Sequence, residues 1–154
     1  SLLIHPKLGS YVFIGILLLN VDVTALEAPF PFRCGNCRKC IDACPTNALN
    51  GKGMDPRKCI SYLTLESKSE IPDELKDKLS GCIAGCDICN DVCPWNKRFG
   101  HPHDHEELTP TEEIFSLTKE DWQKMTQEEF DAIFSKSAVK RANLERIKKI
   151  VGSE

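Results

Sequence analysis

Residues 34–45 of the chain read CGNCRKCIDACP, and residues 82–94 read CIAGCDICNDVCP. The first run spaces its cysteines as C-x2-C-x2-C-x3-C-P and the second as C-x3-C-x2-C-x3-C-P. Thiols separated by two residues can face one metal centre together, and the proline that closes each run ends the local loop. With Cys59 between them, the two runs hold all nine cysteines of the chain.

The first run has the spacing of bacterial two-cluster ferredoxins, in which the fourth cysteine binds the other cluster. Two such runs that face each other predict crossed ligation of two 4Fe–4S clusters. The ligands of the first cluster would be Cys34, Cys37, Cys40 and Cys93, and three ligands of the second would be Cys44, Cys86 and Cys89. Its fourth ligand is Cys59 or Cys82. Sequence proximity favours Cys82, and spacing alone excludes neither.

Two other uses of the cysteines fit less well. Two zinc sites would also take eight thiolates, but zinc ribbons carry separated C-x2-C pairs rather than two runs that each close on Cys-Pro. Nine cysteines cannot all pair as disulfides, and thiols two residues apart more often bind a metal or carry out redox chemistry. The pattern therefore predicts iron–sulfur clusters.

The composition limits the class of protein. A chain of 154 residues with 41% hydrophobic and 28% charged residues can build a core of ordinary domain size, which excludes a disordered protein. The formal net charge of −3 disfavours a strongly basic nucleic-acid module.

Three regions follow from the pattern: residues 1–33, residues 34–100 with all the cysteines, and residues 101–154, which have none. The apolar run Tyr11–Leu19 is too short for a membrane helix, which needs about 20 residues. We expect it to be a buried β-strand at the edge of a sheet whose other strands are missing. The predicted fold is α+β: a two-cluster ferredoxin-like module with this strand remnant and a helical C-terminal tail.

Helix signals mark the rest of the chain. Short helices are expected over residues 56–66, where Asp55 precedes Pro56 as an N-cap, and over residues 71–79. Two capping boxes with hydrophobic staples begin at Thr118 and Thr126. A last helix over residues 138–151 would bury the face formed by Leu144, Ile147 and Val151.

Several stretches together resemble epoxyqueuosine reductase, the cobalamin-dependent enzyme of tRNA queuosine modification. They are the first cysteine run through Thr46, CISYLTLE at 59–66, GCDICNDVCPWNK at 85–97, GSYVFIG at 9–15 and SAVKR at 137–141. The resemblance implies Cys59, not Cys82, as the fourth ligand of the second cluster. It also implies that electrons pass from one cluster to the other and then to the cobalt, to reduce epoxyqueuosine at the wobble position.

In that family a larger upstream domain binds cobalamin and supplies the catalytic acid. Since the chain opens with Ser1 rather than Met, residues 1–33 would be one edge of that domain. No catalytic residue is then expected in this fragment, which would be inactive alone. The resemblance further implies a cytoplasmic monomer that binds no membrane, with tRNA as substrate and an unidentified electron donor. Ile16 departs from the family, which commonly has glutamate there.

The alternative hypothesis is a stand-alone ferredoxin-like electron-transfer subunit, or the relay of a related reductive dehalogenase. Residues 59–64 and the helical tail argue against it. The alternating His101, His103 and His105 could bind a divalent metal, although we favour a solvated linker. Basic residues near the cysteines could meet tRNA phosphates or offset cluster charge, and both uses stay open; they are Arg33, Arg38, Lys39, Arg57, Lys58, Lys97 and Arg98.

Overall fold

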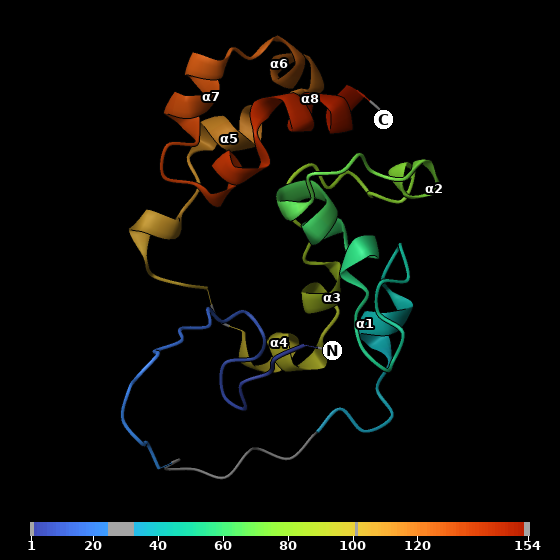
Figure 1. The fold of residues 1–154 in the computed structure, drawn as a ribbon, viewed down its shortest axis with the longest axis vertical. Coiled ribbons are helices and arrows are strands. Elements are labelled where there is room, and N and C mark those ends of the chain that lie inside the picture. The colour runs from blue at the N-terminus through green and yellow to red at the C-terminus, as the bar shows by residue number, and fades with distance from the viewer. Residues whose placement is uncertain (1, 25–32, 101, 153–154) are drawn as a thin grey trace.

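The structure is a computed structural model that describes residues 2–24, 33–100 and 102–152. Short helices and turns follow one another along the chain (Figure 1). The helices are α1 (Lys39–Asp42), η1 (Pro56–Lys58), η2 (Tyr62–Glu66), α2 (Asp73–Lys76), α3 (Ile88–Asp91), α4 (Pro94–Phe99), η3 (Glu106–Leu108), α5 (Glu112–Ser116), α6 (Lys119–Lys124), α7 (Gln127–Ile133), η4 (Ala138–Ala142) and α8 (Leu144–Gly152).

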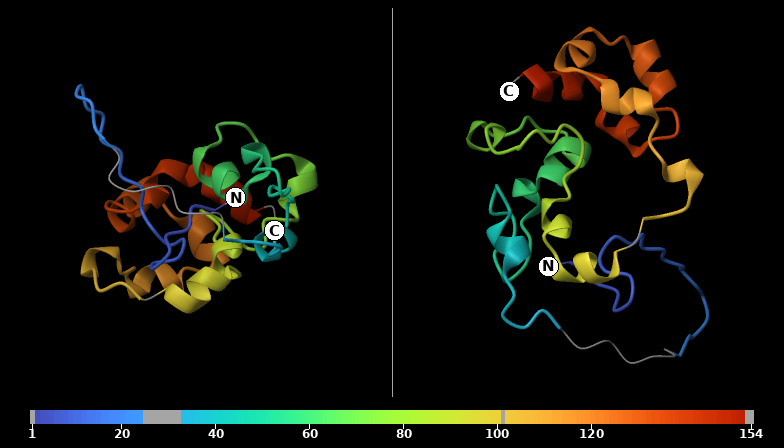
Figure 2. Two further views of the ribbon diagram at one scale, coloured as in Figure 1. Left: turned by 90° about the horizontal axis from the view of Figure 1, so that it is seen from below. Right: turned by 180° about the vertical axis from the view of Figure 1, so that it is seen from behind.

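The β part of the predicted α+β fold is absent from the described residues. Their only β pairing is two isolated bridges, His5 with Gly9 and Leu49 with Met54. The expected buried strand at Tyr11–Leu19 is instead an extended stretch in which Phe13 is 90% and Leu18 is 95% exposed. A strand requires a neighbouring backbone for its N–H and C=O groups, and no described segment pairs its backbone with this one. Figure 2 shows it projecting from the helical body.

The start of this segment is nevertheless anchored to the cysteine region. The Ser10 N–H donates to Asn96 Oδ1 at 2.6 Å, and Asn96 Nδ2 donates to Ser10 Oγ at 2.7 Å. Tyr11 donates its hydroxyl proton to Asp91. Gly9 has a φ of +79°, and a Cβ there would lie 2.3 Å from Asn96 Oδ1, so the close approach requires glycine. The anchor therefore holds residues 9–11 against α3 and α4.

Local capping signals are confirmed. The Asp55 carboxylate accepts the Arg57 N–H at 3.1 Å, with Pro56 in the first turn. Thr118 with Asp121 and Thr126 with Glu129 form the two expected capping boxes. Each joins residues only three positions apart, so it needs no tertiary contact to form.

The last expected helix, over residues 138–151, is wrong in its extent. The chain forms η4, breaks at Asn143 with a φ of +53°, and restarts as α8. Asn143 Oδ1 accepts the Arg146 N–H at 2.9 Å, so its side chain satisfies an orphan donor of the new helix. The predicted buried face of Leu144, Ile147 and Val151 is confirmed.

Two hydrophobic clusters hold the body together. The C-terminal cluster is built from α6, α7, η4 and α8 around Phe130 and Phe134, each 1% exposed. The second cluster joins Ile60 and Leu63 to the segment of residues 71–79, and it also includes Ile150 of α8. Because α8 contributes to both clusters, the C-terminal helices are packed directly onto the segment that follows Cys59.

Candidate metal centre

The two cysteine runs build the same local structure twice. The residue before α1 is Arg38, with φ −123° and ψ 5°, and the residue before α3 is Asp87, with φ −116° and ψ 10°. The residues after these helices, Ala43 and Val92, again agree within a few degrees. Helices α1 and α3 pack side by side (Figure 1). Each run thus presents its Cys-x3-Cys-Pro segment with the same backbone geometry, next to the other run.

The first group of thiols draws on both runs. Burial raises the pKa of Cys34, and the neighbouring charges of Cys37, Cys40 and Cys93 raise it further. Three of these cysteines come from the first run, whereas Cys93 closes the second run and is 5% exposed. The effect of one charge on another falls off with distance, so Cys93 lies in the neighbourhood of the three first-run thiols.

A second group surrounds Cys89. Burial raises the pKa of Cys89 to about 11, followed by the charge of Cys86, and Cys59 contributes in the same direction. Cys59 lies outside both runs. The structure therefore brings it beside the second run, although it is far from Cys89 in sequence.

Cys82 is displaced by one residue from the repeated pattern. Cys34 lies three positions before Cys37, and the matching position before Cys86 is Ile83. The Ile83 side chain packs against both hydrophobic clusters. Cys82 itself packs against the second cluster, and its thiol lies 3.9 Å from the Ser80 carbonyl oxygen. An apolar side chain thus occupies the place that a first-run cysteine takes.

Cys44 has an environment unlike those of Cys34 and Cys89. Burial raises its pKa, but hydrogen bonds from the Leu49 N–H, the Thr46 hydroxyl and the Ala48 N–H lower it, and the net pKa is lowered. Thr46 Oγ1 lies 3.6 Å from Cys44 Sγ. The structure therefore stabilises this thiol as a thiolate, the form that binds iron.

The donor set fits two 4Fe–4S clusters. All nine cysteines are described and none forms a disulfide, so the thiols are available as ligands. Among residues 2–24, 33–100 and 102–152, no three His, Cys, Asp or Glu side chains converge closely enough for a single metal ion. A cubane does not need that convergence, because each thiolate binds a separate iron corner.

Thr64 joins the Cys59 segment to the loop before Cys86. Its side chain is fully buried, and its hydroxyl donates to the Ile60 carbonyl at 2.8 Å while accepting the Gly85 N–H at 2.9 Å. Gly85 has a φ of +88° and directly precedes Cys86. One hydroxyl therefore ties together two loops that each carry a thiol.

We expect Thr64→Val to lower the free energy of unfolding by roughly 1–3 kcal/mol, because the half-buried Gly85 N–H loses its acceptor and the Ile60 carbonyl loses a donor. Urea unfolding of the anaerobically prepared protein measures the change. Thr64→Ser keeps the hydroxyl and should retain most of the stability. Equal stability of the valine variant and the parent would contradict this role.

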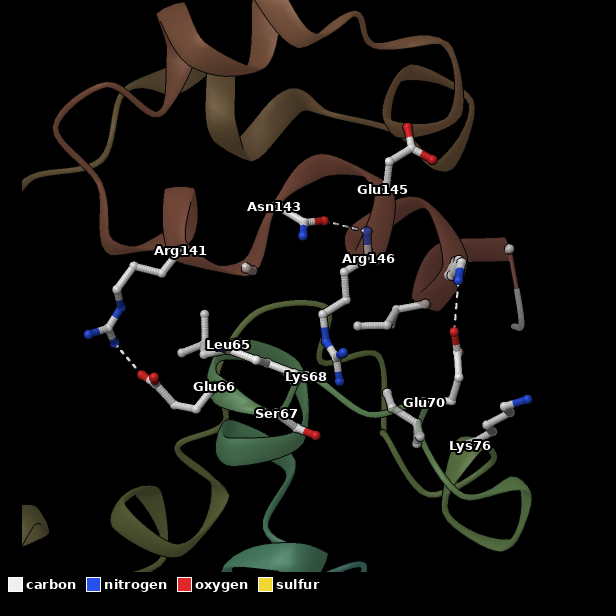
Figure 3. A pocket seen from close by; sticks show the side chains of 15 residues that line it. Leu65, Glu66, Ser67, Lys68, Glu70, Lys76, Arg141, Asn143, Glu145 and Arg146 are labelled. Carbon is white, nitrogen blue, oxygen red and sulfur yellow. Dashed lines mark hydrogen bonds and ion pairs between the residues drawn. The ribbon is translucent and has the colours of Figure 1, made fainter.

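Side chains of η4 and α8 contact the same segment. Arg146 donates to the carbonyl oxygens of Leu63 and Ser69 from one side of a pocket of about 860 Å3. Two ion pairs flank it, Arg141 with Glu66 at 2.6 Å and Lys149 with Glu70 at 2.8 Å (Figure 3). Basic and acidic side chains both line this pocket, which lies between the C-terminal helices and the segment that follows Cys59.

Several basic residues named from the sequence also have partners within the chain. Arg38 pairs with Asp42 at 3.4 Å, and Arg57 with Asp55 at 3.0 Å. Both pairs are exposed and contribute little to stability. His103 and His105 are exposed in the linker, and His101 lies outside the described residues. Ile16 is 78% exposed on the projecting segment.

Thr46, Thr64 and Asn96 were not among the residues that cysteine spacing singled out. Thr64 belongs to the CISYLTLE match, which could have indicated it, and Asn96 belongs to the match that ends at Lys97. Their roles depend on contacts between distant segments, such as Asn96 with Ser10. No spacing rule predicts contacts of that kind.

Comparison with known proteins gives a consistent result. The family described as a 4Fe-4S double cluster binding domain matches residues 33–96. The epoxyqueuosine reductase of Leadbetterella byssophila is 48% identical over 149 residues, which are 97% of this chain and 48% of that protein. The epoxyqueuosine reductase of Cellulophaga algicola is 45% identical over 150 residues, again 97% of this chain and 48% of that protein. The chain thus spans about half the length of these relatives.

Solved structures agree with the sequence comparison. Epoxyqueuosine reductase from Bacillus subtilis has a TM-score of 0.83 at 31% identity, covering 97% of this chain and 40% of that one. A second structure, of an epoxyqueuosine reductase with an epoxyqueuosine-modified tRNA stem loop, has a TM-score of 0.80 at 30% identity. It covers the same shares of the two chains. Among the described residues, no helix is long and apolar enough to cross a bilayer.

Proposed function

Because this chain is a relative of the epoxyqueuosine reductases over 97% of its length, we propose that it is the iron–sulfur electron-relay portion of such an enzyme. The observation that carries the proposal is the packing of α1 against α3, which sets the two cysteine runs side by side so that Cys93 of the second run can join Cys34 of the first. A double-cluster protein requires that crossing, whereas two independent sites would not.

The proposed ligands follow from the groups. The first cluster takes Cys34, Cys37, Cys40 and Cys93, and the second takes Cys44, Cys59, Cys86 and Cys89. The repeat supports the assignment of Cys44, because its position in the first run matches that of Cys93 in the second. Cys59 completes the second set because it lies near Cys89. The competing residue, Cys82, is one position out of register with the first run, where Ile83 stands in the place that matches Cys34.

When bound, the clusters accept and pass on single electrons. The chain's own part is to hold eight thiolates in two adjacent groups and to shield them in part from water: Cys93 is buried, Cys37 is exposed and the other six are half-buried. The packing of α1 against α3 brings the two groups close, which electron transfer between them requires. Two hydrogen bonds hold the segment after Cys59 in place: Thr64 accepts one from the Gly85 N–H, and Arg146 donates one to the Leu63 carbonyl.

For the full-length protein we propose the family's reaction. Two electrons and two protons reduce the epoxide of epoxyqueuosine at the tRNA wobble position, giving queuosine and water. Cobalamin is the proposed cofactor of that step, and no residue of this chain is assigned to it. Residues 34–100 form the ferredoxin-like domain, residues 1–33 the edge of the catalytic domain, and residues 101–154 the linker and C-terminal helices. The proposed protein is a cytoplasmic monomer that takes electrons from a separate donor.

The test has two readouts. Anaerobically prepared chain should contain about eight irons and eight sulfides, as two cubanes require, with the visible charge-transfer absorption of iron–sulfur clusters. A chimera, in which residues 1–154 replace the matching segment of the relative that is 48% identical, should reduce epoxyqueuosine in tRNA.

The intact relative is the control for both readouts. Stoichiometric zinc without visible absorption would overturn the iron–sulfur assignment. A chimera that holds both clusters and cobalamin but does not reduce its substrate would favour a relay of another kind, such as a stand-alone electron-transfer subunit.

A further inference from the structure

The two cysteine runs repeat one backbone geometry, yet they differ at the residue that follows each Cys-Pro. After Cys44-Pro45 this residue is Thr46, whereas after Cys93-Pro94 it is Trp95. Thr46 carries a hydroxyl next to a thiol of its own run. Trp95 stacks on Phe99 with ring centroids 5.5 Å apart. Any effect of the Thr46 hydroxyl therefore acts on one site and has no counterpart at the other.

The Thr46 hydroxyl lies against the sulfur of Cys44. Its Oγ1 is 3.6 Å from Cys44 Sγ, a distance that a hydrogen bond to the large sulfur atom allows. In the thiol form either atom could donate the proton. Once the sulfur binds iron it has no proton, so the hydroxyl must be the donor.

The surroundings favour this bond over one to water. Thr46 is 3% exposed, Ala48 is 2% and Leu49 is 6%. Asn47 has a φ of +52°, a left-handed conformation that asparagine adopts readily, and it curls the chain around the sulfur. Cys44 itself is half-buried, and a hydrogen bond in a site partly closed to water is electrostatically stronger than one in bulk water.

We propose that the Thr46 hydroxyl donates to the Cys44 thiolate and raises the reduction potential of the cluster that Cys44 binds. The inference rests on the proposed function, because it requires the two clusters. Reduction adds negative charge to a cluster, and a donor on a ligand sulfur stabilises that charge. Thr46 acts only through Cys44 and makes the two clusters unequal, which biases the direction in which an electron passes between them.

Redox titration of the anaerobically prepared protein, followed by electron paramagnetic resonance, resolves the two potentials. Thr46→Val should lower one potential and leave the other unchanged. At a fixed ambient potential near the midpoint, the ratio of reduced to oxidised cluster should fall about tenfold, which is about 59 mV for one electron. Thr46→Ser restores the hydroxyl and should restore the potential.

Thr111→Val is the matched control, since Thr111 is exposed and its side chain makes no capping hydrogen bond, and it should change neither potential. If Thr46→Val does not retain its clusters, Thr46→Ala removes the same hydroxyl with less bulk. If both clusters are intact and the two potentials are unchanged or shift together, the proposed role of Thr46 is overturned and the proposed function stands. A parent protein without eight irons would overturn the proposed function itself.

Discussion

Cys59→Ser is expected to reduce the iron content of the anaerobically prepared protein from about eight to about four per chain, because one cubane loses a ligand. A serine hydroxyl is harder and far less acidic than a thiol, so it binds that iron corner poorly. Cys59 lies close enough to Cys89 to raise its pKa, which places it within the second group of thiols.

Cys82→Ser is the matched variant and should retain about eight irons. Cys82 is one residue out of register with the repeat. The position that matches Cys34 is Ile83, whose side chain packs against the two hydrophobic clusters. Iron and acid-labile sulfide assays with absorption spectra measure both variants. Loss of iron from Cys82→Ser and its retention in Cys59→Ser would show that Cys82, not Cys59, is the ligand.

Phe130→Ala should lower the free energy of unfolding by roughly 3–5 kcal/mol, because it removes a large side chain and leaves a cavity. Phe130 is 1% exposed and packs against Phe134, with ring centroids 5.0 Å apart. Trp122 also stacks on Phe134, with ring centroids 5.5 Å apart. Phe130 thus lies at the centre of the cluster that joins α6, α7 and α8.

Phe115→Ala makes the same change at a residue that is 77% exposed, and it should alter stability by no more than about 0.5 kcal/mol. Thermal or urea unfolding of the cluster-loaded protein compares the two variants. Similar losses at Phe130 and Phe115 would mean that the C-terminal helices do not pack as a cooperative unit.

The predictions for Phe130 and Cys59 differ in how far the sequence could anticipate the contacts on which they rest. Hydrophobic staples around Thr118 and Thr126 placed Trp122, Met125 and Phe130 beside helix starts, and all three are buried. The stacking of Trp122 on Phe134 depends on the angle between α6 and α7, which no local pattern specifies. Cys59 was implied by a family resemblance, whereas sequence proximity favoured Cys82 and spacing excluded neither.

The two expectations that the structure contradicts, the buried strand and the unbroken last helix, fail for one physical reason. The Tyr11–Leu19 run has strand propensity, but a strand forms only against another backbone, and no described segment pairs with it. The helix expected over residues 138–151 is amphipathic, yet Asn143 breaks it and begins α8 anew. Propensity and periodicity describe one segment at a time, whereas these outcomes depend on what lies beside it.

Ligand spacing and helix caps could be predicted from the chain because they involve residues within a few positions of one another. The Cys-x2-Cys and Cys-x3-Cys-Pro units and the two capping boxes are of this kind. The spacing also predicted that Cys93 joins Cys34, whereas tertiary packing decided that Cys59 lies near Cys89. Tertiary packing also decided that Thr64 joins Ile60 to Gly85. Such contacts close long loops, so their geometry is set by the packing of whole segments and not by the order of neighbouring residues.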